Sequence, residues 1–323
     1  MRLSVAPMLG RTDRHFRFFL RLISRRVLLY TEMVVSSAAV GSNAYRVLAF
    51  DRHEKPLILQ LGGSDPVELG RCAELAQALG YDGINLNVGC PSDRVQQGRF
   101  GACLMKTPRL VAECVAAILA RTHLPVSVKC RIGVDELDQY QHLAEFIAKV
   151  AEGGCHTFIV HARKAWLKGL SPKENRTLPP LRYDYVYRLK REFPKLTIVL
   201  NGGIVDLDQA EAQLQWVDGV MLGRAVYQNP YLLASADARF YQDSHPIPSR
   251  QEVLEAFLPY LTCQLEKGVP LTSMTRHLFG LYHGQPGARC WRRFLSRLGQ
   301  AGAGIEALKA WLAEAKAERP EVS

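Results

Sequence analysis

A cysteine that follows a short apolar run is the residue of this chain best placed to do chemistry. The run Gly83-Ile84-Asn85-Leu86-Asn87-Val88 leads into Gly89-Cys90-Pro91. An apolar run broken by glycine and proline is typical of a strand that ends in a loop, and strand carboxyl ends are where α/β barrels carry out their chemistry. A single cysteine is more often a buried structural residue, so a catalytic role for Cys90 depends on what the other strands bring to the same place.

Short apolar runs alternate with helical patterns over most of the chain. The runs that we expect to be strands cover residues 2–8, 28–32, 57–61, 83–87, 126–131, 157–161, 197–201 and 219–222. Between them, apolar residues recur at helical spacing in residues 65–79, 108–121, 139–151, 183–193 and 206–214. Eight β-α repeats predict an α/β fold of the (β/α)8, or TIM-barrel, type. An open doubly wound sheet would need a G-x-G-x-x-G turn after an early strand, and the sequence has none there.

The repeat pattern ends before the chain does. Residues 242–249 contain two prolines among polar residues, which is typical of a linker. Beyond them only helical periodicity remains, in residues 251–265, 271–282, 288–298 and 304–317. We therefore expect a barrel domain over residues 1–241 and a small all-helical C-terminal domain over residues 242–323.

Polar side chains stand where nearly every predicted strand ends. Gln60, Lys129 and His161 lie at or within two residues of the end of an apolar run, Asn87 ends another, and Cys90 follows it by three residues. In a (β/α)8 barrel these ends meet on one rim, so an amide, a thiol, an ammonium and an imidazole are expected to converge there. Such convergence is typical of a pocket and not of core filling.

Two glycine-rich turns follow the last two predicted strands. Asn201-Gly202-Gly203 is one, and Gly223-Arg224 is the other. Barrels of this kind hold a phosphate at this place, because glycines let backbone N–H groups approach an anion. Pro7-Met8, Gln60 and Lys129 could serve an isoalloxazine ring, which predicts a flavin with one phosphate. Pyridoxal phosphate would also use a phosphate site and Lys129, but it would leave Gln60 and Cys90 unexplained.

The chain is basic, with 41 Lys+Arg against 31 Asp+Glu and a formal net charge of +10. This balance favours a polyanionic partner, of which nucleic acid is the leading candidate. The eight cysteines form no Cys-x-x-Cys pair, which argues against a zinc ribbon or an iron–sulfur cluster, and we expect no metal. The first residues are too weakly apolar for a signal peptide, and no run is long enough to span a membrane. We therefore expect a cytoplasmic protein with free thiols.

Together these segments resemble the tRNA-dihydrouridine synthases, in order along almost the whole chain. The resemblance is carried by Ala6-Pro7-Met8, Leu59-Gln60-Leu61-Gly62-Gly63, Asn85-Leu86-Asn87-Val88-Gly89-Cys90-Pro91, Val128-Lys129-Cys130-Arg131-Ile132-Gly133, His161-Ala162-Arg163, Asn201-Gly202-Gly203-Ile204 and Gly223-Arg224. Further stretches are similar to the bacterial branch that acts at positions 20 and 20a of the tRNA D-loop. They are Tyr30-Thr31-Glu32-Met33, residues 162–167, residues 169–176 and residues 287–293.

The resemblance implies an enzyme that reduces uridine 20/20a to 5,6-dihydrouridine, with tightly bound FMN and with NADPH as reductant. It implies that Cys90 donates the proton to C5 while reduced FMN gives a hydride to C6. The residues that it implies for FMN are Pro7, Met8, Leu9, Gln60, Lys129, His161, Asn201, Gly202, Gly203, Gly223 and Arg224. Those that it implies for tRNA are Asn87, Lys173, Arg176, Arg289 and Arg292.

Two other functions stay open at this point. An FMN enzyme acting on a free pyrimidine or on dihydroorotate would share the barrel and the phosphate site, although it would not need the basic C-terminal helices. A non-catalytic RNA-binding protein would not need the polar rim. Beyond tRNA we expect no obligate protein partner and a monomer. The choice among positions 20, 20a or both, the particular tRNAs, and NADPH against NADH stay undecided.

Overall fold

The computed structural model describes residues 2–300 and 304–317. The chain divides into two compact units. One comprises Met1–Asp13 and Val27–Gly223, and the other comprises Arg14–Arg26 and Arg224–Ser323. The predicted domain boundary between residues 241 and 242 stays a prediction, because a division by compactness does not test which segments form functional domains.

The first unit is a parallel β-barrel, as predicted. Its strands are β1 (Leu3–Val5), β2 (Leu29–Tyr30), β3 (Val34–Val35), β4 (Leu57–Gly62), β5 (Gly83–Val88), β6 (Val126–Arg131), β7 (Thr157–His161), β8 (Thr197–Asn201) and β9 (Gly219–Leu222). They pair in the order β1-β9-β8-β7-β6-β5-β4-β2, and β3 also pairs with β4. A parallel bridge between Ser4 and Leu28 joins the first strand to the start of the second and closes the ring. The nine strands occupy eight positions around the barrel, because β2 and β3 are two segments of one interrupted strand that pairs with β4.

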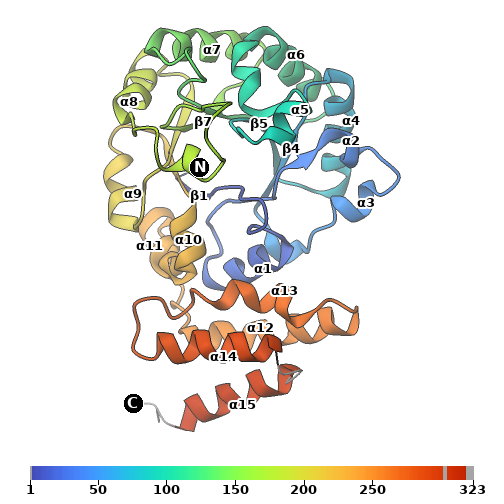
Figure 1. Ribbon diagram of the computed structural model, residues 1–323, viewed down its shortest axis with the longest axis vertical. Helices are drawn as coiled ribbons and strands as arrows, with labels where there is room; N and C mark the ends of the chain where they lie inside the picture. The colour runs from blue at the N-terminus through green and yellow to red at the C-terminus, as the bar shows by residue number, and fades with distance from the viewer. Residues whose placement is uncertain (1, 301–303, 318–323) are drawn as a thin grey trace. The chain divides into compact units, whose positions relative to one another are not determined.

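Helices run back between the strands on the outside of the barrel (Figure 1). The long ones are α4 (Pro66–Leu79), α6 (Pro108–Leu119), α7 (Tyr140–Glu152), α8 (Tyr183–Glu192) and α9 (Leu207–Gln213). Helix α4 shows why they begin and end where the sequence indicates. The Asp65 side chain accepts a hydrogen bond from the Glu68 amide, Pro66 occupies the first turn, and Gly80 ends the helix with a φ of +83°.

Short helices occupy the connections at which the sequence pattern predicts only loops. They are α2 (Ser36–Ala39), α3 (Ala44–Val47), η1 (Arg52–Glu54), α5 (Asp93–Gln97), η2 (Gly101–Lys106) and η3 (Glu174–Arg176). None is long enough to show a helical period in its sequence. Elements α2, α3, α5, η2 and η3 follow the carboxyl ends of their strands, so they shape the rim of the barrel on the side of the predicted site.

The barrel interior changes from apolar to polar along its axis. One buried apolar cluster contains side chains from five strands and, just after β1, Ala6; its members are Ala6, Tyr30, Ile58, Ile159, Val199 and Met221. Side chains alternate along a strand, so the next inward position lies two residues further on. On β4 the inward position after Ile58 is Gln60. On β6 the inward positions are Ser127 and Lys129, so both strands present polar side chains here. Apolar packing thus supports a polar layer at the strand carboxyl ends.

The second unit is helical. It contains α1 (Arg14–Ile23), α10 (Arg224–Gln228), η4 (Pro230–Ser235), α11 (Ala236–Tyr241), α12 (Arg250–Glu266), α13 (Leu271–Thr275), η5 (Arg276–Leu278), α14 (Ala288–Gln300) and α15 (Gly304–Ala317). Trp291 lies in its core at 1% exposure, and its indole N–H donates to the Leu278 carbonyl at 2.8 Å. No helix within residues 2–300 and 304–317 is long and apolar enough to cross a membrane.

Candidate active site

Cys90 lies in the loop that follows β5, and Asn87 holds that loop. The side-chain Oδ1 of Asn87 accepts hydrogen bonds from the backbone N–H groups of Gly89 and Cys90, both at 3.0 Å. The carbonyl of Cys90 accepts from the Ala102 amide at 2.8 Å, which ties the loop to η2. The Cys90 thiol is half-buried and lies 3.6 Å from the Ser92 hydroxyl. Cys90 therefore keeps part of its surface exposed on a backbone that is fixed from two sides.

A chain of side-chain amides runs from Asn87 into the barrel. Asn87 Nδ2 donates to Gln60 Oε1 at 2.9 Å, and Gln60 Nε2 donates to Asn85 Oδ1 at 2.7 Å. Asn85 Nδ2 donates to the hydroxyl of Ser127 at 2.9 Å and lies 3.3 Å from the Ser127 carbonyl. Three strands thus join one hydrogen-bonded series, which we call the amide ladder (Ser127, Asn85, Gln60 and Asn87). Sequence reasoning selected Gln60 and Asn87 but missed Asn85 and Ser127, whose inward positions on β5 and β6 could have identified them.

Lys129 brings a positive charge to the same layer. Its Nζ donates to Asn201 Oδ1 at 2.9 Å, and Asn201 Nδ2 donates to the Met221 carbonyl at 2.8 Å. Burial, together with the nearby Arg131 cation, lowers the pKa of Lys129 from its ordinary 10.5 to about 8. An ammonium that is partly desolvated and donates to a neutral amide is suited to an anionic ligand.

The Asn201-Gly202-Gly203 turn approaches its neighbours too closely for side chains. Gly202 has a φ of +109°, and a Cβ there would lie 2.6 Å from His161 Cδ2. Gly203 has a φ of +78°, and its Cβ would lie 2.7 Å from the Tyr183 hydroxyl. That hydroxyl donates to the Gly202 carbonyl at 2.6 Å. Both conformation and space therefore require glycine, and the imidazole of His161 packs directly on the turn.

The remaining residues predicted for the cofactor lie at the ends of β1 and β9. The Met8 amide donates to the Thr12 hydroxyl at 2.8 Å, which folds this segment back on itself. Leu9 is 78% exposed, unusually high for a leucine. Gly223 ends the first unit, and Arg224 begins α10 in the second. The first unit therefore brings together Gln60, Asn87, Cys90 and the Lys129–Asn201 pair, while Arg224 belongs to the other unit.

Arg131 is a site residue that sequence reasoning left without a role. Its side chain is 3% exposed, and it donates to three main-chain carbonyls: Gly89 at 3.0 Å, Lys164 at 3.0 Å and Asn175 at 2.8 Å. Burial, opposed in part by Cys90, lowers the pKa of Arg131 to about 10. The guanidinium thus joins the Cys90 loop to the segment after β7. The sequence feature that could have identified Arg131 as a site residue is its position at the end of β6, two residues after Lys129.

The four basic residues predicted for tRNA are all exposed. Lys173 and Arg176 lie at η3 in the first unit, on a segment that the buried Asn175 holds by donating to the carbonyls of Trp166 and Leu170. Arg289 and Arg292 lie on the exposed face of α14 in the second unit. Each pair is therefore exposed to solvent, and the two pairs belong to different units.

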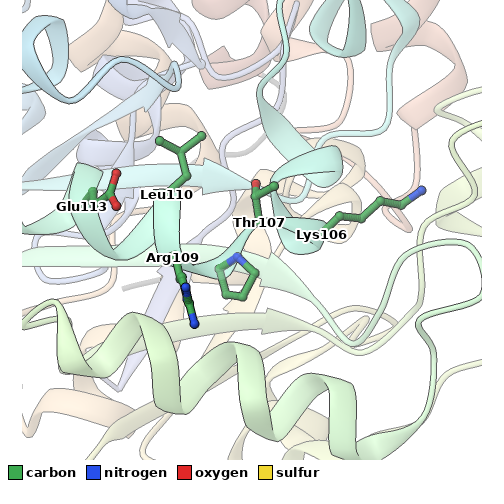
Figure 2. Close-up of a pocket in the computed structure, with 6 residues that line it drawn as sticks. Lys106, Thr107, Arg109, Leu110 and Glu113 are labelled. Atoms are coloured by element: carbon green, nitrogen blue, oxygen red, sulfur yellow. The ribbon is translucent and has the colours of Figure 1, made fainter.

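Cys103 and a surface pocket lie apart from these contacts. The Cys103 thiol donates to the Phe100 carbonyl at 3.1 Å, and burial raises its pKa above the ordinary value. A cavity of about 440 Å³ opens at the start of α6 (Figure 2). It is lined by Lys106, Thr107, Pro108, Arg109, Leu110 and Glu113, none of which is a predicted site residue. We assign no role to either feature.

Among solved structures, an old yellow enzyme homologue from Zymomonas mobilis is similar with a TM-score of 0.54 and 14% sequence identity. The match covers 76% of this chain and 90% of that protein. A structure titled 2-naphthoyl-CoA reductase gives a TM-score of 0.57 at 10% identity, over 73% of this chain and 49% of that one. At such identities the likeness supports the barrel fold alone.

Sequence relatives are much closer. A Shewanella oneidensis protein named tRNA-dihydrouridine(20/20a) synthase is 57% identical over 308 residues, which cover 95% of this chain and 91% of that protein. The Escherichia coli protein of the same name is 55% identical over 311 residues, or 95% of this chain and 90% of that protein. The family described as Dihydrouridine synthase (Dus) matches residues 4–316. This chain therefore belongs to the dihydrouridine synthase family.

Proposed function

We propose that this protein reduces uridine to 5,6-dihydrouridine at position 20, position 20a or both in the D-loop of tRNA. The observation that carries the proposal is the fixed Cys90 loop beside a layer of buried polar groups, in a chain whose relatives bear the name of this activity over nine-tenths of both lengths. The basic charge of the chain suits a polyanionic substrate.

We propose FMN as the bound cofactor, because the residues present fit one. Lys129 offers a half-buried cation, Gln60 keeps one N–H and one oxygen lone pair beyond its ladder bonds, and the Gly202-Gly203 turn has no room for side chains next to His161. The other residues that would hold FMN are Pro7, Met8, Leu9, Asn201, Gly223 and Arg224. When bound, FMN supplies a hydride for C6 of the uracil ring, and we propose NADPH as the source of its electrons.

Cys90 is the proposed proton donor to C5 of the same ring. A thiol can act as a general acid once it is positioned over the ring. The Asn87 hydrogen bonds to the Gly89 and Cys90 amides supply the positioning. Lys129 and Arg131 add positive charge at the carboxyl end of β6, which favours the electron-rich ring that a proton must reach.

The substrate base lies inside a folded RNA and has to be turned out into the barrel. Unstacking costs a few kcal/mol, which contacts to the phosphates offset. Lys173 and Arg176 in the first unit, and Arg289 and Arg292 in the second, are the proposed phosphate contacts. Asn87 has one amide N–H left after its internal bonds, and we propose that this donor contacts the base.

Replacement of Cys90 by alanine tests the proposal. We expect Cys90→Ala to retain a flavin spectrum and NADPH-dependent flavin reduction, while dihydrouridine formation falls by about 10²- to 10⁴-fold. Cys103→Ala is the matched control, since it removes another half-buried thiol of the first unit. Dihydrouridine formation is measured by mass spectrometry of digested tRNA. Wild-type protein without a flavin spectrum, or a Cys90→Ala variant with normal turnover, would refute the proposal.

A further inference from the structure

The amide ladder has a fixed direction because its two ends are main-chain groups. At one end the Gly89 and Cys90 N–H groups can only donate, so Asn87 must present Oδ1 to them and Nδ2 to Gln60. At the other end the Ser127 carbonyl can only accept, so Asn85 must present Nδ2 to it and Oδ1 to Gln60. Gln60 is held between the two with a single orientation of its amide.

The ladder is buried along its whole length. Gln60 is 1% exposed, Asn85 0%, Asn87 9% and Ser127 7%. The Ser127 hydroxyl also donates to the Ile84 carbonyl at 3.2 Å, which fixes its own orientation. Buried amides that lose a partner pay the full cost of desolvation, so rotation of one member disturbs its neighbours. A flipped Gln60 would place an NH2 group against the Asn87 NH2 group and force Asn87 away from the Cys90 loop.

We propose that Asn85 and Ser127 are positioning residues for the Cys90 thiol. They touch neither the loop nor the thiol. They fix the orientation of Gln60, and Gln60 in turn fixes Asn87, which carries the Gly89 and Cys90 amides. The same contacts leave Asn87 an uncommitted N–H donor, which can pair with a carbonyl of uracil and is opposed by the amino group of cytosine. The catalytic consequence rests on the proposed function, whereas the structural consequence does not.

Amide hydrogen exchange tests the structural consequence without reference to activity. In the flavin-loaded protein we expect Asn85→Leu to speed exchange at Gly89 and Cys90 by about fivefold to tenfold, the factor that corresponds to one neutral hydrogen bond. Ser127→Ala should change these amides in the same direction and by less, because Asn85 keeps the Ser127 carbonyl. Mass spectrometry of short peptides that cover residues 83–93 gives the rates.

Thr31→Val is the matched control. Thr31 is 5% exposed, and its hydroxyl accepts from the backbone N–H of Gln60 at 3.0 Å, so the variant removes a buried hydrogen bond to the same residue and leaves the ladder intact. Exchange at Gly89 and Cys90 should stay at the wild-type rate in this variant. Wild-type exchange in Asn85→Leu, or equal acceleration in Thr31→Val, would overturn the proposal. If Asn85→Leu does not fold, Ser127→Ala replaces it in the test, and wild-type exchange at Gly89 and Cys90 in that variant would overturn the proposal.

Steady-state kinetics test the catalytic consequence. We expect Asn85→Leu to lower kcat for dihydrouridine formation by about 10- to 100-fold through misplacement of the thiol. The KM for tRNA should change by less than kcat does, since only the proposed Asn87 contact to the base is disturbed and the phosphate contacts are elsewhere, and NADPH-dependent flavin reduction should continue. A higher KM with unchanged kcat would overturn the positioning role. Failure of the wild-type protein to form dihydrouridine would refute the proposed function, and the exchange data would still decide on the ladder.

Discussion

Replacement of Lys129 by methionine measures the cost of holding its charge in the barrel. The pKa of Lys129 in the folded protein is about 8, below the ordinary 10.5 that applies in the unfolded chain. Between these values the unfolded chain binds more protons than the folded one, so the stability of the protein rises as pH increases. The full difference corresponds to about 3 kcal/mol. Methionine has a similar length and carries no charge, so it removes this dependence.

The contribution of Lys129 to the free energy of unfolding changes measurably between pH 7 and pH 9. At pH 7 Lys129 is protonated in both states, whereas at pH 9 it has lost its proton in most folded molecules and kept it in the unfolded chain. The wild-type protein should therefore gain about 1.3 kcal/mol relative to Lys129→Met over this interval. Burial raises the pKa of Cys72, Cys114, Cys130 and Cys155 to about 12, which lowers stability at high pH, but both proteins contain these thiols and the difference cancels them.

Urea denaturation of flavin-free protein at pH 7, 8 and 9 gives the required free energies of unfolding. The same series on Lys195→Met, at an exposed lysine, controls for the general effect of removing a positive charge. A difference between wild type and Lys129→Met that does not change with pH would refute the argument that Lys129 is held in a desolvated site. The variant should also lose flavin on dialysis, because it lacks the cation that we propose for the cofactor.

Four further substitutions test the glycine turn, Arg131 and the proposed tRNA contacts. Gly202→Ala should lose flavin on gel filtration and destabilise the protein by about 1–3 kcal/mol, since its φ of +109° and the approach to His161 both exclude a side chain; full retention with an unchanged Tm would contradict this. Arg131→Met should lower the free energy of unfolding by about 1–3 kcal/mol and reduce dihydrouridine formation while NADPH still reduces the flavin; normal turnover would show that the three carbonyls need no guanidinium. Arg289→Ala and Arg292→Ala should each reduce the slope of log Kd for tRNA against log salt by about 0.7 to 0.9, and an unchanged slope would exclude phosphate contacts.

The sequence predicts the barrel well because its two periodicities are strong. Buried parallel strands appear as short apolar runs, and capped helices such as α4 begin at an Asp-Pro pair that signals a first turn. The strand ends could be predicted for the same reason, since Gln60, Lys129 and His161 lie at or within two residues of the ends of their strands. Family membership and the fold were both predicted and are confirmed.

The contacts among the site residues could not be predicted from the sequence. The period of two places Asn85 and Asn87 on the same face of β5, but it does not show that both amides bond to Gln60 on β4. Arg131 could equally have formed an ion pair, and only the fold shows three main-chain carbonyls around it. Short helices such as α5 were also missed, because one turn leaves no period to detect. The grouping of α1 with the C-terminal helices depends on long-range packing that local patterns do not contain.

The bonds of Arg131 have a consequence for how relatives of this protein can diverge. All three acceptors belong to the main chain, which every residue type possesses, so the guanidinium holds two loops without requiring any particular side chain in them. Substitutions in the segment after β7 can therefore alter the RNA contacts that we propose for it while the Cys90 loop keeps its anchor. A change of substrate at this site need not be preceded by a loss of catalytic geometry.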